Sequence, residues 1–207
     1  MQQHRKHSLG RPGAAARFTL LALTSLFLTL PLAARATEVA GVKFEDSARI
    51  DRQALVLNGA GQRAKFFLRV YAMGLYLPEK NGDVDGILAA KGAKRITIVP
   101  LMELSAQQFV DALSGGIEKN NSEAEIEGLK DRLQTFEANL LALGKANRGT
   151  PISLDWLPEH GTRLLVAGQP RGKDIPGEDF YRALLKIWLG QKPAQDDLKE
   201  ALLGRAH

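Results

Sequence analysis

The sequence feature that most constrains the fold is the run from Lys65 to Leu77, which reads KFFLRVYAMGLYL. Its aromatic, β-branched and other apolar residues occupy both odd and even positions. An extended segment of this kind is apolar on both faces, which suits a strand that other elements cover on both sides. The run therefore predicts a central strand of a sheet, ended by Pro78 and the turn residues 81–83.

Further strands are predicted where β-branched residues cluster or apolar and polar residues alternate. These segments are Val39–Phe44, Gln53–Asn58, Lys94–Pro100 and a hairpin formed by Thr150–Leu157 and Thr162–Ala167. Gly59 and Gly61 lie between the second strand and the central run. They predict a tight turn between those two strands.

Four helices are predicted after the first strands. Ser105 with Gln108, and Ser122 with Glu125, have the spacing of capping boxes, and each precedes an apolar stripe with helical spacing. The other two predicted helices are Glu178–Leu189 and Asp196–Leu203. Because strands, helices, a hairpin and helices follow one another without a repeating βαβ unit, we expect an α+β fold around a largely antiparallel sheet.

The first 36 residues have the pattern of a secretory signal peptide. A basic segment precedes the apolar run from Phe18 to Ala33, and Ala34-Arg35-Ala36 follows as an A-x-A cleavage pattern. The run has 16 residues, whereas a spanning helix needs about 20. We expect cleavage after Ala36, a single domain over residues 37–207, and export, to a periplasm where the source has an outer membrane. The alternative is an uncleaved membrane anchor.

Charge and residue counts narrow the function classes. The formal net charge of +5 comes from five basic residues that precede Glu38, so the remaining chain is neutral and lacks the basic footprint of a nucleic-acid-binding protein. Cysteine is absent, which excludes disulfides and thiol chemistry. After residue 36 the only histidines are His160 and His207, without partners at metal-ligand spacing. We expect no metal, no nucleic acid and no membrane span after signal cleavage.

Residues 59–64 (GAGQRA) fit the dinucleotide-binding pattern G-x-G-x-x-A. That mechanism requires a helix N-terminus directly after the glycines, to bind the pyrophosphate. The following residues predict a strand instead, so we expect no nucleotide and no other cofactor.

Arg63 and Arg69 lie in or beside the most apolar part of the chain. A guanidinium stays charged when it is buried and needs an anionic or carbonyl partner. Each is therefore a ligand-binding candidate, a member of an internal salt bridge or an edge-strand residue facing water. Tyr71 and Tyr76 differ in parity, so at most one faces any given side of the sheet. Trp188 lies on the inner stripe of its predicted helix, a position typical of core packing.

Three motifs resemble the chalcone isomerase-like proteins, most closely their bacterial exported branch. They are residues 57–63 (LNGAGQR), 71–77 (YAMGLYL) and 185–190 (LKIWLG), the last followed by Pro193 and Asp197. The resemblance implies an open-faced β-sandwich in which helices cover one face of a large antiparallel sheet. It also implies a ligand cleft between the sheet and the helices.

The plant enzymes of that family cyclise a chalcone to a flavanone without a cofactor, using arginine and polar groups to stabilise developing negative charge. The family's arginine matches Arg63, and Tyr71 stands where the enzymes have threonine. Their helical tyrosine and asparagine fall near Phe109 and Gly116, and a further threonine falls at Ile187. Other members bind fatty acids without catalysis and hold the carboxylate with the arginine.

The sequence thus predicts a non-catalytic protein that binds an apolar carboxylate such as a fatty acid. The candidate ligand-binding residues are Arg63, Tyr71, Phe109 and Trp188. The alternative is a cofactor-independent isomerase (an intramolecular lyase) acting on a phenolic or enone substrate, with Arg63 and Tyr71 as catalytic residues. A third possibility is an envelope scaffold whose cleft is closed.

Overall fold

The protein is described by a computed structural model that places residues 36–205. Apart from Ala36, the predicted signal peptide lies outside these residues. Cleavage, export and the boundary of the mature chain therefore stay predictions.

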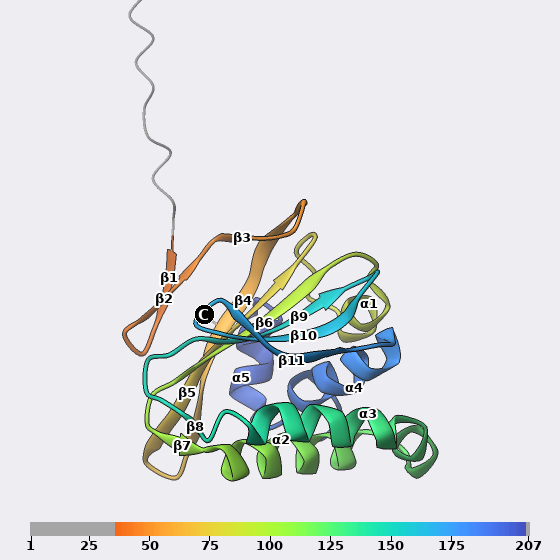
Figure 1. Ribbon diagram of the computed structural model, residues 1–207. Coiled ribbons are helices and arrows are strands. Elements are labelled where there is room, and N and C mark those ends of the chain that lie inside the picture. Colours follow the sequence, from red (N-terminus) through yellow and green to blue (C-terminus); the bar gives the residue numbers. More distant parts are fainter. Residues whose placement is uncertain (1–35, 206–207) are drawn as a thin grey trace, which may run out of the picture. The chain divides into compact units, whose positions relative to one another are not determined.

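A seven-stranded antiparallel sheet forms the centre of the domain, with the strand order β11-β10-β9-β6-β5-β4-β3 (Figure 1). Its strands are β3 (Ser47–Ile50), β4 (Gln53–Lys65), β5 (Leu68–Leu77), β6 (Lys94–Pro100), β9 (Ile152–Leu157), β10 (Gly161–Val166) and β11 (Gln169–Ile175). Two small sheets flank it, formed by β1 (Ala36–Val39) with β2 (Val42–Glu45) and by β7 (Leu104–Ser105) with β8 (Lys145–Ala146).

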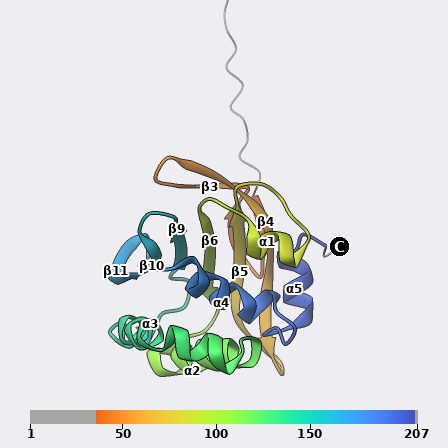
Figure 2. The ribbon, with the colours of Figure 1, turned by 90° about the vertical axis from the view of Figure 1, so that its right-hand side faces the viewer.

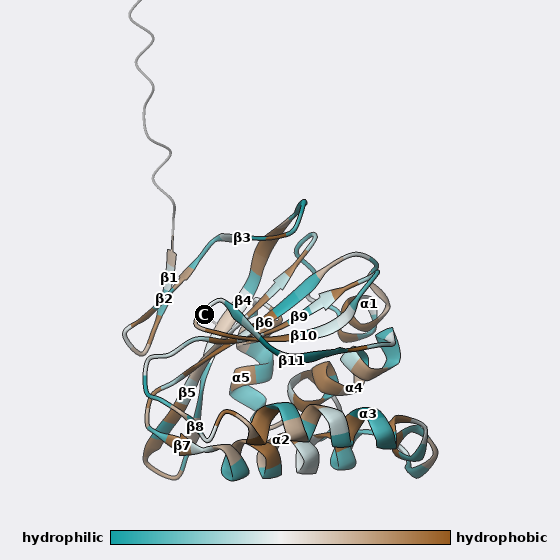
Figure 3. Ribbon diagram, in the orientation of Figure 1, coloured by the Kyte–Doolittle hydropathy of each residue, from teal (hydrophilic) through white to brown (hydrophobic). Residues whose placement is uncertain are grey.

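Helices cover one face of this sheet (Figure 2). They are α1 (Val84–Ala89), α2 (Ala106–Asn120), α3 (Glu123–Leu141), α4 (Glu178–Leu189) and α5 (Asp196–Leu202). The helix α4 is the most deeply buried and packs against α2, whereas β11 and much of α3 are hydrophilic (Figure 3). The predicted α+β class and the one-sided helical layer are confirmed.

The central strand β5 is buried on both faces, as its apolar pattern predicts. Met73 and Leu75 pack in the cluster under the helices, while Ala72 and Tyr76 pack in a second cluster on the opposite face. Phe44 of β2 belongs to that second cluster, and a Cβ atom on Gly74 would lie 2.8 Å from its ring. The β1–β2 hairpin therefore covers part of the face that the helices leave open.

Both predicted capping boxes form. The Ser105 side chain accepts from the Gln108 amide over 3.1 Å and Gln108 Oε1 accepts from the Ser105 amide over 2.9 Å, which starts α2. Ser122 and Glu125 make the same reciprocal pair at the start of α3. These bonds satisfy amide groups that the first helical turn leaves unpaired.

The glycine motif does not form the predicted turn. Instead, β4 continues through Gly59 and Gly61 to Lys65. The two glycines lack side chains and so leave room for α5 to pack closely against the strand. A Cβ atom on Gly59 would lie 2.0 Å from the Ala201 carbonyl oxygen, and one on Gly61 would lie 2.7 Å from the Ala201 Cβ. The predicted strand end at Asn58 corresponds to a register shift between Leu57 and Gly59.

Asn58 ties this irregular point of β4 to two other segments. Its Nδ2 donates to the Leu202 carbonyl over 2.7 Å and to the Asn81 carbonyl over 2.9 Å, and its Oδ1 accepts from the Asn81 amide over 2.7 Å. These bonds fasten α5 and the loop before α1 to the sheet, which explains an asparagine at a buried position.

Two other sequence expectations are corrected. The single strand expected over Val39–Phe44 is two strands, since Ala40 and Gly41 both have positive φ and reverse the chain. The strand expected over Lys65–Leu77 begins only at Leu68, after a turn at Phe66 and Phe67. The sequence also leaves five elements unpredicted, which are β3, α1, β7, β8 and β11.

Candidate functional site

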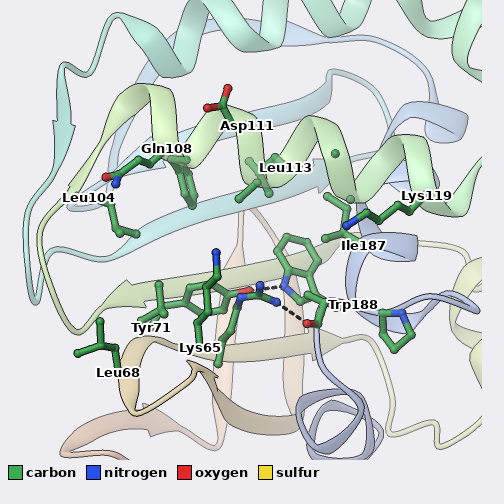
Figure 4. Close-up of a pocket in the computed structure, with 18 of the residues that line it drawn as sticks. Lys65, Leu68, Tyr71, Leu104, Gln108, Asp111, Leu113, Lys119, Ile187 and Trp188 are labelled. Carbon is green, nitrogen blue, oxygen red and sulfur yellow. Dashed lines mark hydrogen bonds between the residues drawn. The ribbon is translucent and has the colours of Figure 1, made fainter.

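A cleft of about 710 Å³ opens between the β4–β5 hairpin on one side and α2, α4 and the α4–α5 linker on the other (Figure 4). Its apolar walls come from these elements and from the segment between β6 and α2. They include Val70, Tyr71, Met102, Leu104, Phe109, Leu113, Ile187, Trp188, Pro193 and Ala194. The volume lies within the range of roughly 300–1,000 Å³ that is usual for small-molecule sites.

Arg63 lines this cleft from β4, and its partner is a neutral group. Its Nη1 donates to the carbonyl oxygen of Ala194 in the α4–α5 linker. Within residues 36–205 no carboxylate lies within 4 Å of the Arg63 guanidinium. A guanidinium has five N–H donors and stays charged. Arg63 therefore presents a positive charge and unused donors to the cleft.

Tyr71 lies directly opposite Arg63, since the two residues are partners in the β4–β5 register. Its hydroxyl oxygen accepts a 2.8 Å hydrogen bond from Trp188 Nε1 (Figure 4). Burial raises the pKa of Tyr71, although the Trp188 hydrogen bond and the Arg63 charge act in the opposite direction. The hydroxyl stays protonated at neutral pH, so its proton is available to an acceptor in the cleft.

Trp188 combines the two roles that the sequence suggests for it. It is 2% exposed and belongs to the core under the helices, as its place on the inner stripe of α4 predicts. It also lines the cleft and orients the Tyr71 hydroxyl. This hydrogen bond was not predicted from the sequence, because 117 residues separate donor and acceptor and no spacing rule connects them.

The structure brings Phe109, Gly116 and Ile187 to the same cleft. These are the positions where the resemblance places tyrosine, asparagine and threonine in the enzymes. Gly116 lies against Ile187, since a Cβ atom there would be 2.7 Å from the Ile187 Cγ2. The helical wall is therefore apolar at all three positions.

The two remaining sequence candidates lie elsewhere. Tyr76 packs in the cluster on the opposite face of the sheet, and burial raises its pKa to about 12. Arg69 is exposed beside the β4–β5 turn and does not line the cleft. Of the two tyrosines with opposite parity, only Tyr71 reaches the cleft.

Three lysines at the cleft were not anticipated. Lys65, Lys119 and Lys192 line it from β4, α2 and the α4–α5 linker, and Asp111 is the one acidic residue among the described lining residues. In the sequence each lysine stands in a separate segment and belongs to no motif. Only the tertiary fold brings the three together at the cleft. The cleft is thus apolar inside with an excess of positive charge.

The α4–α5 linker that forms one wall is held from both sides. Besides the Arg63 bond, Ala64 donates its amide to Gln195 Oε1 over 2.9 Å. From α2, Asn120 Nδ2 donates to the Lys192 carbonyl over 2.9 Å, and Asn120 Oδ1 accepts from the Lys192 amide over 2.8 Å. Arg63 is therefore held through Nη1 beside a linker that is itself fixed by hydrogen bonds. This arrangement limits the side-chain reorganisation that ligand binding would require.

A partly buried ion pair, Arg95–Asp155, lies outside the cleft. Arg95 Nε and Nη2 donate to the two Asp155 carboxylate oxygens over 2.6 and 2.5 Å, so the two side chains neutralise each other. Residues 36–205 contain no group of three metal-ligating side chains. In that same range no helix combines the length and hydrophobicity needed to cross a bilayer.

A family model described as chalcone isomerase-like matches residues 36–204. Among solved structures, a fatty-acid binding protein of Arabidopsis thaliana superposes with a TM-score of 0.61 at 18% sequence identity, covering 79% of this chain and 92% of that chain. At this identity the likeness concerns the fold. No curated protein sequence matches the chain significantly.

Proposed function

Because the chain belongs to the chalcone isomerase-like family, whose model spans nearly the whole described domain, we propose that it binds an apolar carboxylate such as a fatty acid without transforming it. The carboxylate contacts Arg63 and Tyr71, and the acyl chain lies along the apolar wall that includes Phe109. The observation that carries this proposal is the Arg63 guanidinium in an apolar cleft with a backbone carbonyl as its partner instead of a carboxylate.

The charge of Arg63 favours an anionic ligand. A cation beside apolar walls gains more from an anion than it would in water, because the local dielectric constant is lower. The Arg63 donors not used by Ala194 can bind carboxylate oxygens, and the Tyr71 proton supplies one further hydrogen bond. The fold shared with a protein whose name is fatty-acid binding protein supports this ligand class.

The apolar walls favour a ligand with a long hydrocarbon part. Leu104, Leu113 and Ile187 offer surface that a short acid such as acetate would leave in contact with water. Each buried methylene group contributes about 0.8 kcal/mol. We therefore expect affinity to rise with chain length until the cleft is filled. The signal-like N-terminus adds to the proposal that the protein acts in an envelope or extracellular compartment.

Mass spectrometry of the purified protein, first native and then after organic extraction, tests the proposal. We expect a co-purified monocarboxylic acid, and displacement of a fluorescent fatty acid by added long-chain acids. The R63Q variant should lower acid affinity about 10- to 150-fold, the loss of one charge-assisted interaction. A long-chain methyl ester should bind wild type and R63Q alike. R69Q is the matched control, because Arg69 does not line the cleft.

A protein that purifies without lipid and displaces no fatty-acid probe would contradict the proposal. Equal acid affinity in wild type and R63Q would contradict the role of Arg63 even if lipid binds. The melting temperature of R63Q must be measured alongside, since Arg63 also holds the α4–α5 linker.

One observation favours the second candidate, an isomerase: the Arg63 donors and the Tyr71 proton face the same cleft, where they could stabilise an enolate. Against it, the helical wall is apolar at Phe109, Gly116 and Ile187. Loss of such polar groups typically lowers rates by about 100-fold or more each. We expect chalcone to lose its enone absorbance no faster with the protein than without it. Acceleration that disappears in R63Q would favour the isomerase.

A further inference from the structure

The turn between β4 and β5 exposes three successive large apolar side chains. Phe66 is 88%, Phe67 101% and Leu68 60% exposed. Within residues 36–205 one other large hydrophobic side chain is exposed, that of Leu141, with an exposed fraction of 44%. Single exposed apolar residues are ordinary, whereas a contiguous exposed group marks an interaction surface.

The geometry of the turn indicates that these rings do not serve the hairpin itself. Lys65 and Leu68 are register partners, so Phe66 and Phe67 are the two turn residues. Phe66 has a φ of +56°, a region that glycine adopts freely and bulky residues adopt only with strain. Two-residue turns favour glycine or asparagine there. For the stability of the fold alone, glycine at position 66 would be more favourable than phenylalanine, because it adopts this φ without strain.

Charge around the turn is positive. Lys65 and Arg69 flank the aromatic pair at exposed positions. The lysines of the cleft add to this charge, and Asp111 is the acidic residue among the described lining residues. Apolar rings beside cations are the combination that binds the interface of an anionic bilayer, with rings among the upper acyl chains and cations at the phosphates.

The turn also borders the cleft. Lys65, Phe66 and Leu68 all line it, and the turn lies at the lower end of the long hairpin in Figures 1 and 2. A surface that docks at this turn therefore meets the cleft rather than the opposite end of the sheet. An amphiphile leaving that surface could enter the cleft without crossing water.

We propose that the β4–β5 turn is a membrane-docking element that inserts Phe66 and Phe67 into the interface of an anionic bilayer, with Lys65 and Arg69 at the level of the phosphates. The docked protein exchanges its ligand directly with the bilayer, a consequence that rests on the proposed function. Docking itself requires only the turn.

The full-length F67W variant tests insertion at the turn itself. The native tryptophans, Trp156 and Trp188, are 6% and 2% exposed and supply the background, which wild type measures. With vesicles of equal phosphatidylglycerol and phosphatidylcholine, the emission of the introduced tryptophan should shift to shorter wavelength, and brominated phospholipid should quench it. Vesicles of phosphatidylcholine alone should give a much weaker response. An unshifted, unquenched signal would overturn the proposal, and an equal response on both vesicles would overturn the role of the cations.

Substitutions separate docking from ligand binding. In vesicle co-sedimentation we expect about ten-fold weaker binding for F67S, from loss of one buried ring, and about five-fold weaker binding for R69Q. L141S and K43Q are matched controls at an exposed leucine of α3 and an exposed lysine of β2, and should bind as wild type does. Unchanged binding of F67S would overturn the proposal.

Two further measurements distinguish membrane docking from ligand binding and from a protein–protein interface. Phe67 and Arg69 do not line the cleft, so fatty-acid affinity in solution should be unchanged in F67S while transfer from vesicles slows. If the wild type binds no acid yet the tryptophan of F67W inserts, the proposed function fails and docking stands. If F67S instead dissociates a lipid-free oligomer seen by sedimentation velocity, the turn is a protein interface and the membrane proposal fails.

Discussion

The indole nitrogen of Trp188 donates a 2.8 Å hydrogen bond to the hydroxyl oxygen of Tyr71, joining α4 to β5 across the floor of the cleft. The bond uses an acceptor site of the hydroxyl and leaves its proton free. Trp188 thus determines where Tyr71 can donate. The pair couples the helical layer to the strand that lies beside Arg63.

The first prediction concerns this pair. W188F removes the donor while keeping an aromatic ring, so the Tyr71 hydroxyl loses its fixed orientation. Acid affinity should fall about 2- to 10-fold, the size of one net hydrogen bond. The acid affinity of Y71F should fall by at least as much as that of W188F. The double variant should bind acids no more weakly than Y71F, because both substitutions act through one hydroxyl. A fatty-acid displacement assay on all four proteins completes the cycle.

The control for this cycle is W156F, which alters a buried tryptophan that does not line the cleft. It should lose stability without losing acid affinity. Additive losses in Y71F and W188F would mean that the tryptophan acts on the ligand independently of the tyrosine.

A second prediction uses a glycine that faces open space. Gly115 in α2 lines the cleft, and a Cβ atom built there meets nothing within 4 Å. G115L should therefore fold and stabilise α2 by up to about 1 kcal/mol, because glycine is a poor helix former. The new side chain occupies the cleft, so fatty-acid binding should fall by at least ten-fold.

Gly128 in α3 provides the matched comparison, since it also has open space around its Cβ position and does not line the cleft. G128L should gain similar helical stability and keep full affinity. Thermal unfolding and the displacement assay read the two effects separately. If G115L binds acids as well as G128L does, the ligand does not occupy this part of the cleft.

Local signals predicted much of the fold. The capping boxes located α2 and α3, because a cap depends on residues three positions apart. The strand β6 was predicted with its observed bounds, Lys94–Pro100. The turn predicted from the glycine motif was wrong, since the glycines serve the approach of Ala201 from a helix near the end of the chain.

The site was only partly predictable. The resemblance motifs indicated Arg63 and Tyr71, whereas strand parity said only that Tyr71 and Tyr76 face opposite sides. The structure pairs Arg63 with Tyr71 in the β4–β5 register. The Trp188 bond and the three lysines arise from tertiary contacts that leave no local pattern. The exposed Phe66 and Phe67 were expected inside a buried strand, because hydrophobicity alone cannot distinguish a ring that packs in the core from one that faces outward.

A third prediction tests the reason for the glycines of β4. G59A places a Cβ atom 2.0 Å from the Ala201 carbonyl oxygen, a backbone atom that can move only with α5. The free energy of unfolding should fall by about 1–3 kcal/mol, as expected for overpacking. Urea denaturation measures this change, and G128A, which has room for its methyl group, should be neutral or stabilising. An unchanged midpoint for G59A would show that α5 yields easily.

The last prediction concerns pH and the start of α3. The hydrogen bond from Lys186, with help from the Ser122 amide, lowers the pKa of Glu125 to about 2. Its folded value therefore lies below the unfolded value of about 4.3. This stabilisation is fully present above the unfolded pKa and is lost as the pH falls toward 2. The Glu125 side chain is 49% exposed, so solvent screening limits the contribution to about 1 kcal/mol or less.

The E125Q variant isolates that charge, because glutamine can complete the capping box as Gln108 does in α2. At pH 7 we expect E125Q to be less stable than wild type by about 0.5–1 kcal/mol, and the difference to vanish near pH 2. E127Q, at an exposed pair with Lys130, should change stability less. Urea unfolding across this pH range measures both. A constant difference between wild type and E125Q from pH 7 to pH 2 would show that the Lys186 ion pair does not stabilise the packing of α3 against α4.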